Sequence, residues 1–252
     1  MIPLTPLITK YKDSFLLYAF RHMDQMSKCQ YPELTEILVS EMTYLYNIAC
    51  IITFKEVYET EIEQLKNWAL NLNKNLELEQ MKLEFENKMV ELNLRSFIPK
   101  DYTYSYETIW DTMHFMAIVI DDIIDDRQKL TFEFVMYHLH QMKTFYFNIF
   151  VKLQCIICRN HYQHIRGILI GGLERIEICL NRERYGEAVL TVDAITPDNI
   201  TQNAIMKHGL LYLTMVLHDH INQYKYIQLN AKPSTKAFRM KWSHYKNKLE
   251  LN

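Results

Sequence analysis

The segment PELTEILVSEMTYLYNIACIITF, residues 32–54, decides the fold class. Its apolar residues recur every three or four positions, at Leu34, Leu38, Met42, Leu45, Ile48 and Ile52. That spacing places them on one face of an α-helix. Pro32 suits the first turn of such a helix, because its missing N–H would be unpaired there anyway. We therefore predict an amphipathic helix over residues 32–54.

The same periodicity continues on both sides of this segment. In the N-terminal half it also predicts helices over residues 13–27, 56–72 and 77–93. The segment SFIPKDYTYS, residues 96–105, then interrupts the pattern with a proline and several polar residues. We therefore expect two helical parts, residues 1–95 and 96–252.

The C-terminal half repeats the pattern in four long stretches. They predict helices over about 105–123, over 132–153 with Thr131 as N-cap, from the CIIC segment past Gly167 to about 182, and over about 200–229. Residues 183–199 are expected to form a loop, and Ser234 or Thr235 would cap a short last helix. Four aspartates, Asp121, Asp122, Asp125 and Asp126, suggest either a metal site or an acidic turn between helices, and we favour the turn.

Glycine and proline are scarce, with 5 and 6 among 252 residues, and no glycine precedes Gly167. Antiparallel β proteins need turn residues at short intervals, so sandwiches and barrels are disfavoured. Neither glycine-rich phosphate loop, G-x-G-x-x-G or G-x-x-x-x-G-K-[ST], occurs in the sequence. The predicted fold class is all-α.

The overall composition limits which partners and which cellular locations are possible. A formal net charge of −2 gives no electrostatic footprint for nucleic acid. The sequence has no apolar run of the length that spans a membrane, and its N-terminus lacks the apolar core of a signal peptide. Five cysteines, an odd number, exclude a full disulfide framework. We expect no nucleic acid, no membrane span and no secretion, with a cytosolic or nuclear location.

The motif Cys155-Ile156-Ile157-Cys158 has three chemical interpretations besides a pair of buried structural cysteines. Zinc would use His161 and His164 as well, but four ligands on one straight helix span about 13 Å and cannot close a tetrahedral site. A thioredoxin-type motif needs a βαβ context that is missing here. A redox-active disulfide on a helical scaffold is favoured, because a helix start stabilises a thiolate and Arg159 adds positive charge. We therefore expect no metal.

Two further pairs of residues share a helix face. Trp110 and His114 are four residues apart and would wall a flat aromatic cofactor, or form a core Trp beside a hydrogen-bonded His. His218 and Asn222 are also four apart, with Lys225 and Lys232 downstream. They would suit an adenine dinucleotide, or simply form a solvated polar face.

Taken in order, W-x-x-x-H, C-x-x-C and H-x-x-I-N resemble the Erv/ALR family of FAD-dependent sulfhydryl oxidases. The whole chain is similar to divergent baculoviral members of that family, with support from MIPLTPL at the start, ELNLRS at 91–96, TIWDTMHF at 108–115 and CRNHY at 158–162. The sequence departs from the family in four ways: the gap from Cys158 to His218 is longer, residues 1–95 contain no C-x-x-C, and two cofactor motifs differ. Asp219 replaces the first Asn of H-N-x-V-N, and the lysine-proline pair is delayed to Lys232-Pro233.

The resemblance implies a helical bundle that holds FAD in the mouth of four helices. Cys158 would be the flavin-proximal cysteine and Cys155 the one that meets substrate. Trp110 and His114 would contact the flavin, and His218 and Asn222 the adenosine. Lys225 or Lys232 would lie near the phosphates, and Trp242 matches a late Trp of the family.

The implied reaction oxidises protein dithiols with O2 and releases H2O2, in a homodimer located in the host cytoplasm and nucleus, in association with the virion. Residues 1–95 would be a degenerate copy of the catalytic domain, 96–252, that packs as a pseudo-partner. Cys29, Cys50 and Cys179 are interpreted as buried small apolar residues rather than shuttle cysteines. The alternative function is a non-catalytic helical structural or interaction protein of the virus.

Overall fold

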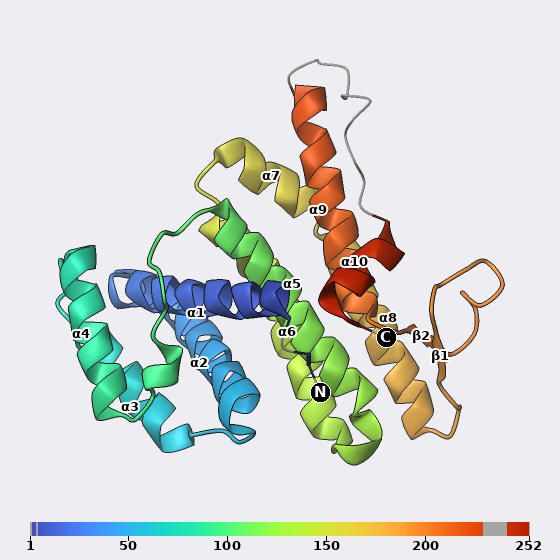
Figure 1. Ribbon diagram of the computed structural model, residues 1–252, viewed down its shortest axis with the longest axis horizontal. Helices are drawn as coiled ribbons and strands as arrows, with labels where there is room; N and C mark the ends of the chain where they lie inside the picture. Colours follow the sequence, from blue (N-terminus) through green and yellow to red (C-terminus); the bar gives the residue numbers. More distant parts are fainter. Residues whose placement is uncertain (1, 4, 229–240, 252) are drawn as a thin grey trace. The chain divides into compact units, whose positions relative to one another are not determined.

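The computed structural model of the chain is dominated by α-helices (Figure 1), which confirms the predicted all-α fold class. It describes residues 2–3, 5–228 and 241–251, with the side chains of 225–228 left out. The chain divides into two compact units, one of residues 10–112 and one of residues 1–9 with 113–252. The division falls inside a helix, whereas the sequence pattern suggested a boundary at 96–105.

The first unit contains the predicted N-terminal helices. They are α1 (Pro6–Ser27), α2 (Pro32–Phe54), α3 (Glu59–Leu70) and α4 (Leu78–Glu91), followed by the 3-10 turn η1 (Arg95–Phe97) and the start of α5 (Tyr106–Asp125). The predicted helix over 32–54 is confirmed, with Pro32 in its first turn. Helix α1 begins at Pro6 rather than at residue 13, because the Thr5 hydroxyl accepts the Ile8 backbone N–H at 3.2 Å and caps it.

Helix α2 is long and apolar enough to cross a membrane, judged by length and composition alone. A core helix meets the same criteria. The side chains that make α2 apolar include Leu38, Met42, Leu45 and Ile48, and these are buried inside the first unit. Their burial accounts for the high mean hydropathy of this helix.

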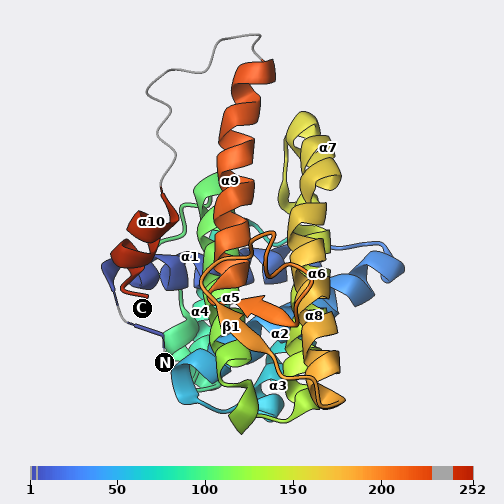
Figure 2. The ribbon, with the colours of Figure 1, turned by 90° about the vertical axis from the view of Figure 1, so that its right-hand side faces the viewer.

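The second unit is built around α5, α6, α8 and α9 (Figure 2). Its elements after α5 are η2 (Arg127–Lys129), α6 (Phe132–Lys152), α7 (Ile156–Ile165), α8 (Gly167–Arg184), β1 (Leu190–Val192), β2 (Ala204–Met206), α9 (Gly209–Gln228) and α10 (Trp242–Leu249). Helix α8 packs against both α6 and α9. The predicted cap of α6 is confirmed, since Thr131 Oγ1 accepts the Phe134 N–H at 3.2 Å.

The helix predicted from the CIIC segment to about residue 182 is two helices. It breaks at Arg166, whose guanidinium donates to the Phe147 carbonyl at 3.0 Å and lies 4.4 Å from the centre of that ring. Gly167 follows, and glycine is a poor helix former. Farther on, a Cβ at Gly172 would lie 2.0 Å from Leu213 Cδ1, so this glycine permits the close approach of α8 and α9.

The segment between α8 and α9 also differs from the prediction. Part of the expected loop, Leu190–Val192, pairs in parallel with Ala204–Met206, so two short strands interrupt the helical pattern. Helix α9 begins at Gly209 rather than at residue 200. The Asp121 carboxylate accepts the Leu210 and Leu211 N–H groups at 3.1 and 3.0 Å and fixes its first turn.

The predicted acidic turn is wrong, because α5 runs on to Asp125 and includes three of the four aspartates. Asp121 is buried in this helix, where it caps α9. The last described helix begins at Trp242, and the predicted caps Ser234 and Thr235 lie outside the described residues.

Candidate active site

Cys155 and Cys158 lie at the N-terminus of α7. Cys155 is the N-cap residue, and its Sγ accepts the Cys158 backbone N–H at 3.2 Å. The C-x-x-C spacing produces this contact, because a capping side chain reaches the N–H three residues ahead. Cys155 is half-buried and Cys158 is exposed. The pair therefore sits at the positive end of the helix, with one sulfur tied to it.

The two thiols have opposite electrostatics. Hydrogen bonds from the Cys158 side chain and then from its backbone lower the pKa of Cys155. Partial desolvation at the surface, followed by the hydrogen bond and the charge of Cys155, raises the pKa of Cys158 to about 11. The lowered pKa expected at the helix start therefore belongs to Cys155, and a reduced pair loses its first proton there.

Three polar contacts hold α7 against the end of α6. The Arg159 guanidinium donates to the Leu153 carbonyl at 2.9 and 3.2 Å. The buried Tyr162 hydroxyl donates to the Tyr146 carbonyl at 2.6 Å. These bonds join α7 to α6 and to Leu153, the residue after α6, and so hold the cysteine motif in place.

His114 of α5 meets His218 of α9. The atoms His114 Nε2 and His218 Nδ1 are 3.3 Å apart, and the ring centroids are 5.5 Å apart. On its other side His114 Nδ1 lies 2.8 Å from Thr214 Oγ1. His114 is buried and His218 is half-buried, so the pair reaches from the core of the unit toward its surface.

The hydrogen bonds assign the tautomer of His114 and the donor atom of His218. The Thr214 hydroxyl donates to the Leu211 carbonyl at 2.8 Å, so it accepts from His114 Nδ1–H. Burial, with a contribution from His218, lowers the pKa of His114 to about 3 and keeps the ring neutral. Its Nε2 is then an acceptor, and His218 Nδ1–H donates to it. His218 therefore presents its other nitrogen, Nε2, away from His114.

Aromatic side chains of α10 complete this cluster. The Tyr245 ring meets His114 edge-on, with centroids 5.8 Å apart, and Trp242 packs beside Tyr245 and Tyr212 at 6.2 and 5.4 Å. The indole nitrogen of Trp242 is buried and has no hydrogen-bond partner among the described residues. A buried N–H without a partner is costly, so this donor suits a ligand that brings an acceptor.

The other predicted cofactor residues lie one helical turn or more from His114 or His218, or outside the described residues. Trp110 is half-buried one turn before His114 on α5, in the part of that helix that belongs to the first unit. Asn222 is exposed one turn after His218 on α9. Lys225 lies in α9 but its side chain is outside the description, and Lys232 lies outside the described residues.

A contact between α7 and α9 was not predicted. The His161 ring, one turn after Cys158, stacks on Tyr224 with centroids 3.5 Å apart and an interplanar angle of 15°. The centroid of the His220 ring lies 5.4 Å from the centroid of the His161 ring. Thr214 and His218 are four residues apart, as are His220 and Tyr224. Helical periodicity therefore places the two members of each pair on one face of α9. Which partner each pair meets depends on tertiary packing.

The remaining cysteines and the acidic residues show no second chemical centre. Cys50 and Cys179 are buried, as predicted, and burial raises the pKa of each thiol. Cys29 is half-buried instead, with its Sγ 3.6 Å from the Tyr31 carbonyl oxygen. Within residues 2–3, 5–228 and 241–251, no group of three or more His, Cys, Asp or Glu residues is placed to hold a metal ion.

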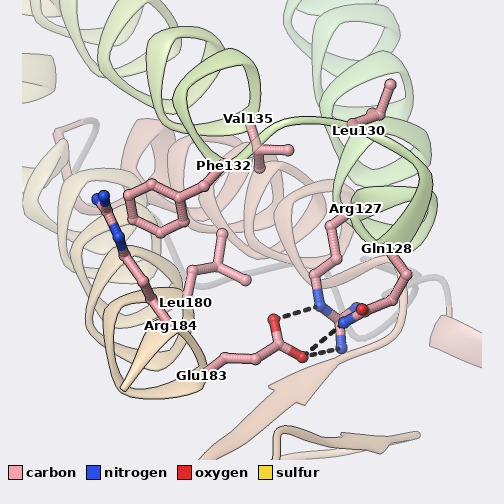
Figure 3. A pocket seen from close by; sticks show the side chains of 8 residues that line it. All are labelled: Arg127, Gln128, Leu130, Phe132, Val135, Leu180, Glu183 and Arg184. Atoms are coloured by element: carbon pink, nitrogen blue, oxygen red, sulfur yellow. Dashed lines mark hydrogen bonds and ion pairs between the residues drawn. The ribbon is translucent and has the colours of Figure 1, made fainter. Parts of the chain in front are cut away.

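A pocket in the second unit lies elsewhere (Figure 3). It is lined by η2 and by residues of α6 and α8, and Glu183 spans it by accepting Arg127 Nε at 3.0 Å. None of the predicted site residues lines it. Glu183 also accepts from Gln128 at 2.9 Å.

Comparisons with known proteins place the chain in a family. The family model of Baculovirus P33 matches residues 5–251. A protein of Autographa californica nuclear polyhedrosis virus called "FAD-linked sulfhydryl oxidase" is 43% identical over 100% of both chains. The "33 kDa early protein" of Orgyia pseudotsugata multicapsid polyhedrosis virus is 39% identical, again over 100% of both chains. The chain therefore belongs to the Baculovirus P33 family.

Proposed function

We propose that this protein is an FAD-dependent sulfhydryl oxidase that makes disulfide bonds in proteins. The single observation that carries this function is the full-length similarity to a relative named "FAD-linked sulfhydryl oxidase". The cysteine pair at the start of α7 adds chemical support, because it combines a low-pKa thiol with an exposed one. The substrates are protein dithiols, and O2 is the final electron acceptor.

The first step is thiol–disulfide exchange at the cysteine pair. A substrate thiolate attacks Cys155 Sγ, the Cys155–Cys158 bond breaks, and Cys158 leaves with the electron pair. Because the pKa of Cys158 is about 11, it is the poorer leaving group, and we expect this attack to be the slower exchange step. The product is a mixed disulfide between Cys155 and substrate.

The second step releases the oxidised substrate. A second substrate thiolate attacks the substrate sulfur of the mixed disulfide, and Cys155 leaves as a thiolate that the Cys158 N–H stabilises. Two substrate thiols have then lost two electrons and two protons, and the cysteine pair has been reduced. FAD, when bound, supplies the two-electron acceptor that reoxidises the pair and the oxygen chemistry that gives H2O2.

The residues around His114 fit FAD by their donor and acceptor chemistry. The neutral His114, the His218 and Tyr245 rings and the unpartnered Trp242 N–H offer flat aromatic surfaces and a buried hydrogen-bond donor. Cys158, Trp110 and Asn222 are assigned to the cofactor by the family resemblance, as are Lys225 and Lys232 for the phosphates. We propose that Cys158 faces the flavin and Cys155 faces substrate.

A spectrum and an oxygen electrode test this function. We expect the purified protein to absorb near roughly 450 nm, as bound flavin does, and to consume O2 with dithiothreitol. Cys155→Ser and Cys158→Ser should each keep the absorbance and lose turnover. Colourless protein that consumes no O2 would contradict the proposed oxidase function. It would favour the alternative, a non-catalytic helical protein of the virus.

We further propose a homodimer in the host cytoplasm and nucleus, in association with the virion, in which residues 1–95 act as a degenerate partner for the catalytic part, 96–252. The family resemblance supports this arrangement. Light scattering on the eluted protein measures the mass, and twice the 30.4 kDa of the chain is expected. A monomer mass with full turnover would contradict the dimer and leave the oxidase intact.

A further inference from the structure

Two large apolar side chains are exposed between the catalytic cysteines. Ile156 is 69% exposed and Ile157 is 61% exposed, in the first turn of α7. Single exposed apolar residues are ordinary on protein surfaces. Two adjacent isoleucines inside the redox motif are different, because they follow Cys155 directly in the first turn of α7 and are exposed to any protein that brings a thiol to it. Covering them would release apolar surface from water and favour binding.

The stretch around the motif is also free of negative charge. Residues 134–173 contain four Lys or Arg and no Asp or Glu, although the whole chain has a formal net charge of −2. In the structure this stretch forms nearly all of α6, all of α7 and the first turns of α8, and α6 packs against both of the others. The motif therefore lies in a stretch of the second unit whose only charged residues are Lys and Arg.

Two of these cations lack a carboxylate partner among the described residues. The Arg159 guanidinium is bonded to the neutral Leu153 carbonyl, and the Arg166 guanidinium to the neutral Phe147 carbonyl and ring. Lys143 is different, because its ammonium pairs with Glu177 at 2.7 Å. Arg159 lies in the first turn of α7 and Arg166 directly follows its last residue. Because their bonds are to neutral groups, their positive charge remains to attract a partner.

We propose that the surface formed by Ile156, Ile157, Arg159 and Arg166, named here the CIIC surface, selects dithiol segments flanked by acidic and apolar residues. The occupant is an extended segment of a protein substrate that carries two cysteines. Its apolar side chains cover the isoleucines, and its carboxylates face the two arginines. The inference rests on the proposed function and specifies its substrate class. Charge complementarity speeds encounter and disfavours basic segments.

Peptides with the same length and cysteine spacing test the selection. Four sets of flanking residues are compared: acidic with apolar, acidic with polar, basic with apolar, and neutral polar. At low salt the acidic and apolar peptide should have a kcat/KM about tenfold above that of the basic and apolar one. The difference should shrink as salt rises to about 1 M, since screening then acts within about 3 Å. Dithiothreitol, which is uncharged, is the reference substrate.

Matched variants locate the preference on the CIIC surface. The double change Ile156→Ser and Ile157→Ser should lower the ratio of peptide kcat/KM to dithiothreitol kcat/KM by about tenfold. Ile178→Ser, at an isoleucine of α8 that is 55% exposed, should leave the ratio unchanged. Arg166→Gln should halve or further reduce the preference for acidic flanks. Arg184→Gln, whose guanidinium likewise lies over a ring, that of Phe132 at 4.5 Å, should not.

The outcomes separate this inference from the proposed function. No turnover of dithiothreitol by wild-type protein would overturn the oxidase itself. Turnover of dithiothreitol with equal kcat/KM for all four peptides, or with a preference for basic flanks, would overturn the substrate selection alone. The wild-type peptide comparison decides the question even if a variant fails to fold. A merely structural role of the isoleucines would lower both activities together and leave their ratio unchanged, which also rejects the proposal.

Discussion

His114 and His218 are 104 positions apart in sequence, yet their Nε2 and Nδ1 atoms lie 3.3 Å apart. The contact joins α5 to α9. On the other side of the His114 ring, Nδ1 forms a hydrogen bond of 2.8 Å with Thr214 Oγ1. A row of donors and acceptors therefore runs from the Leu211 carbonyl through Thr214 and His114 to His218. Each member fixes the orientation of the next, and the row ends beside the proposed cofactor site.

Thr214→Val should weaken flavin binding about tenfold, because it removes the acceptor that orients His114 while keeping the volume of the side chain. Equilibrium titration of the apoprotein with FAD, followed by absorbance and fluorescence, measures the change. Thr112→Val is the matched control, since Thr112 is also fully buried but bonds only the Thr108 carbonyl of its own helix. Equal weakening by both variants would contradict an orienting role for Thr214.

His114 should make the second unit labile to acid. Its pKa of about 3 lies below the ordinary 6.5, so unfolded chains bind a proton that the folded protein does not. Its stabilising contribution is complete above about pH 6.5 and is lost as the pH falls toward about 3, by about 1.4 kcal/mol per pH unit. His114→Gln should flatten the dependence of urea midpoints on pH between 7.5 and 4. His140→Gln, at an exposed histidine of α6, should keep the wild-type slope. An unchanged slope in His114→Gln would refute the assignment.

In the reduced protein, Cys155 should react with iodoacetamide well before Cys158, because its pKa is lowered while that of Cys158 is about 11. Mass spectrometry of digested samples across pH 6–11 gives the two midpoints. Cys158→Ser keeps a side-chain donor near Cys155 and should preserve its low midpoint, whereas Cys158→Ala should raise it. If Cys158 were alkylated first, the lower pKa would belong to Cys158, and Cys158 would be the better leaving group.

Asp121→Ala should destabilise the second unit by about 1–2 kcal/mol, the usual cost of a lost helix cap. Burial raises the pKa of Asp121 to about 8 against the pull of the two backbone bonds. An acid with a raised pKa contributes most below its unfolded value near 4, and stability falls as the pH rises toward 8. Asp121→Asn should remove that dependence. Asp126→Ala, which breaks a surface pair with Lys129, should cost less than about 0.5 kcal/mol in the same unfolding curves.

Local periodicity predicted the helices well where packing and propensity agree. Residues 32–54 and 132–153 were placed within a residue or two, because both begin with a recognisable first turn or cap, Pro32 and Thr131. The start of α9 was missed, since its cap is Asp121, which comes from another helix. A local sequence pattern cannot identify this cap, because Asp121 lies 89 positions before Leu210 in the sequence. The strand pair 190–192 and 204–206 was missed because each strand has only three residues.

The candidate site was predictable as residue pairs and not as an assembly. Spacing of four identified His114 and His218 as members of helical faces, and the structure brings them together. Thr214 and Tyr245 gave no signal, because threonine and tyrosine on a helix face are common in any core. The contact of His161 with Tyr224 depends on the fold of α7 back onto α9, which the prediction of one continuous helix would have prevented.

The capping of α7 by Cys155 links protein folding energy to redox chemistry. The Cys158 N–H stabilises the Cys155 thiolate, which exists only after the pair is reduced, so the helix favours the dithiol over the disulfide. A stabilised dithiol raises the reduction potential of the pair, by about 30 mV for each 1.4 kcal/mol, and makes it the stronger oxidant toward substrate. The first turn of this helix thus helps to set how readily the cysteine pair accepts electrons from substrate.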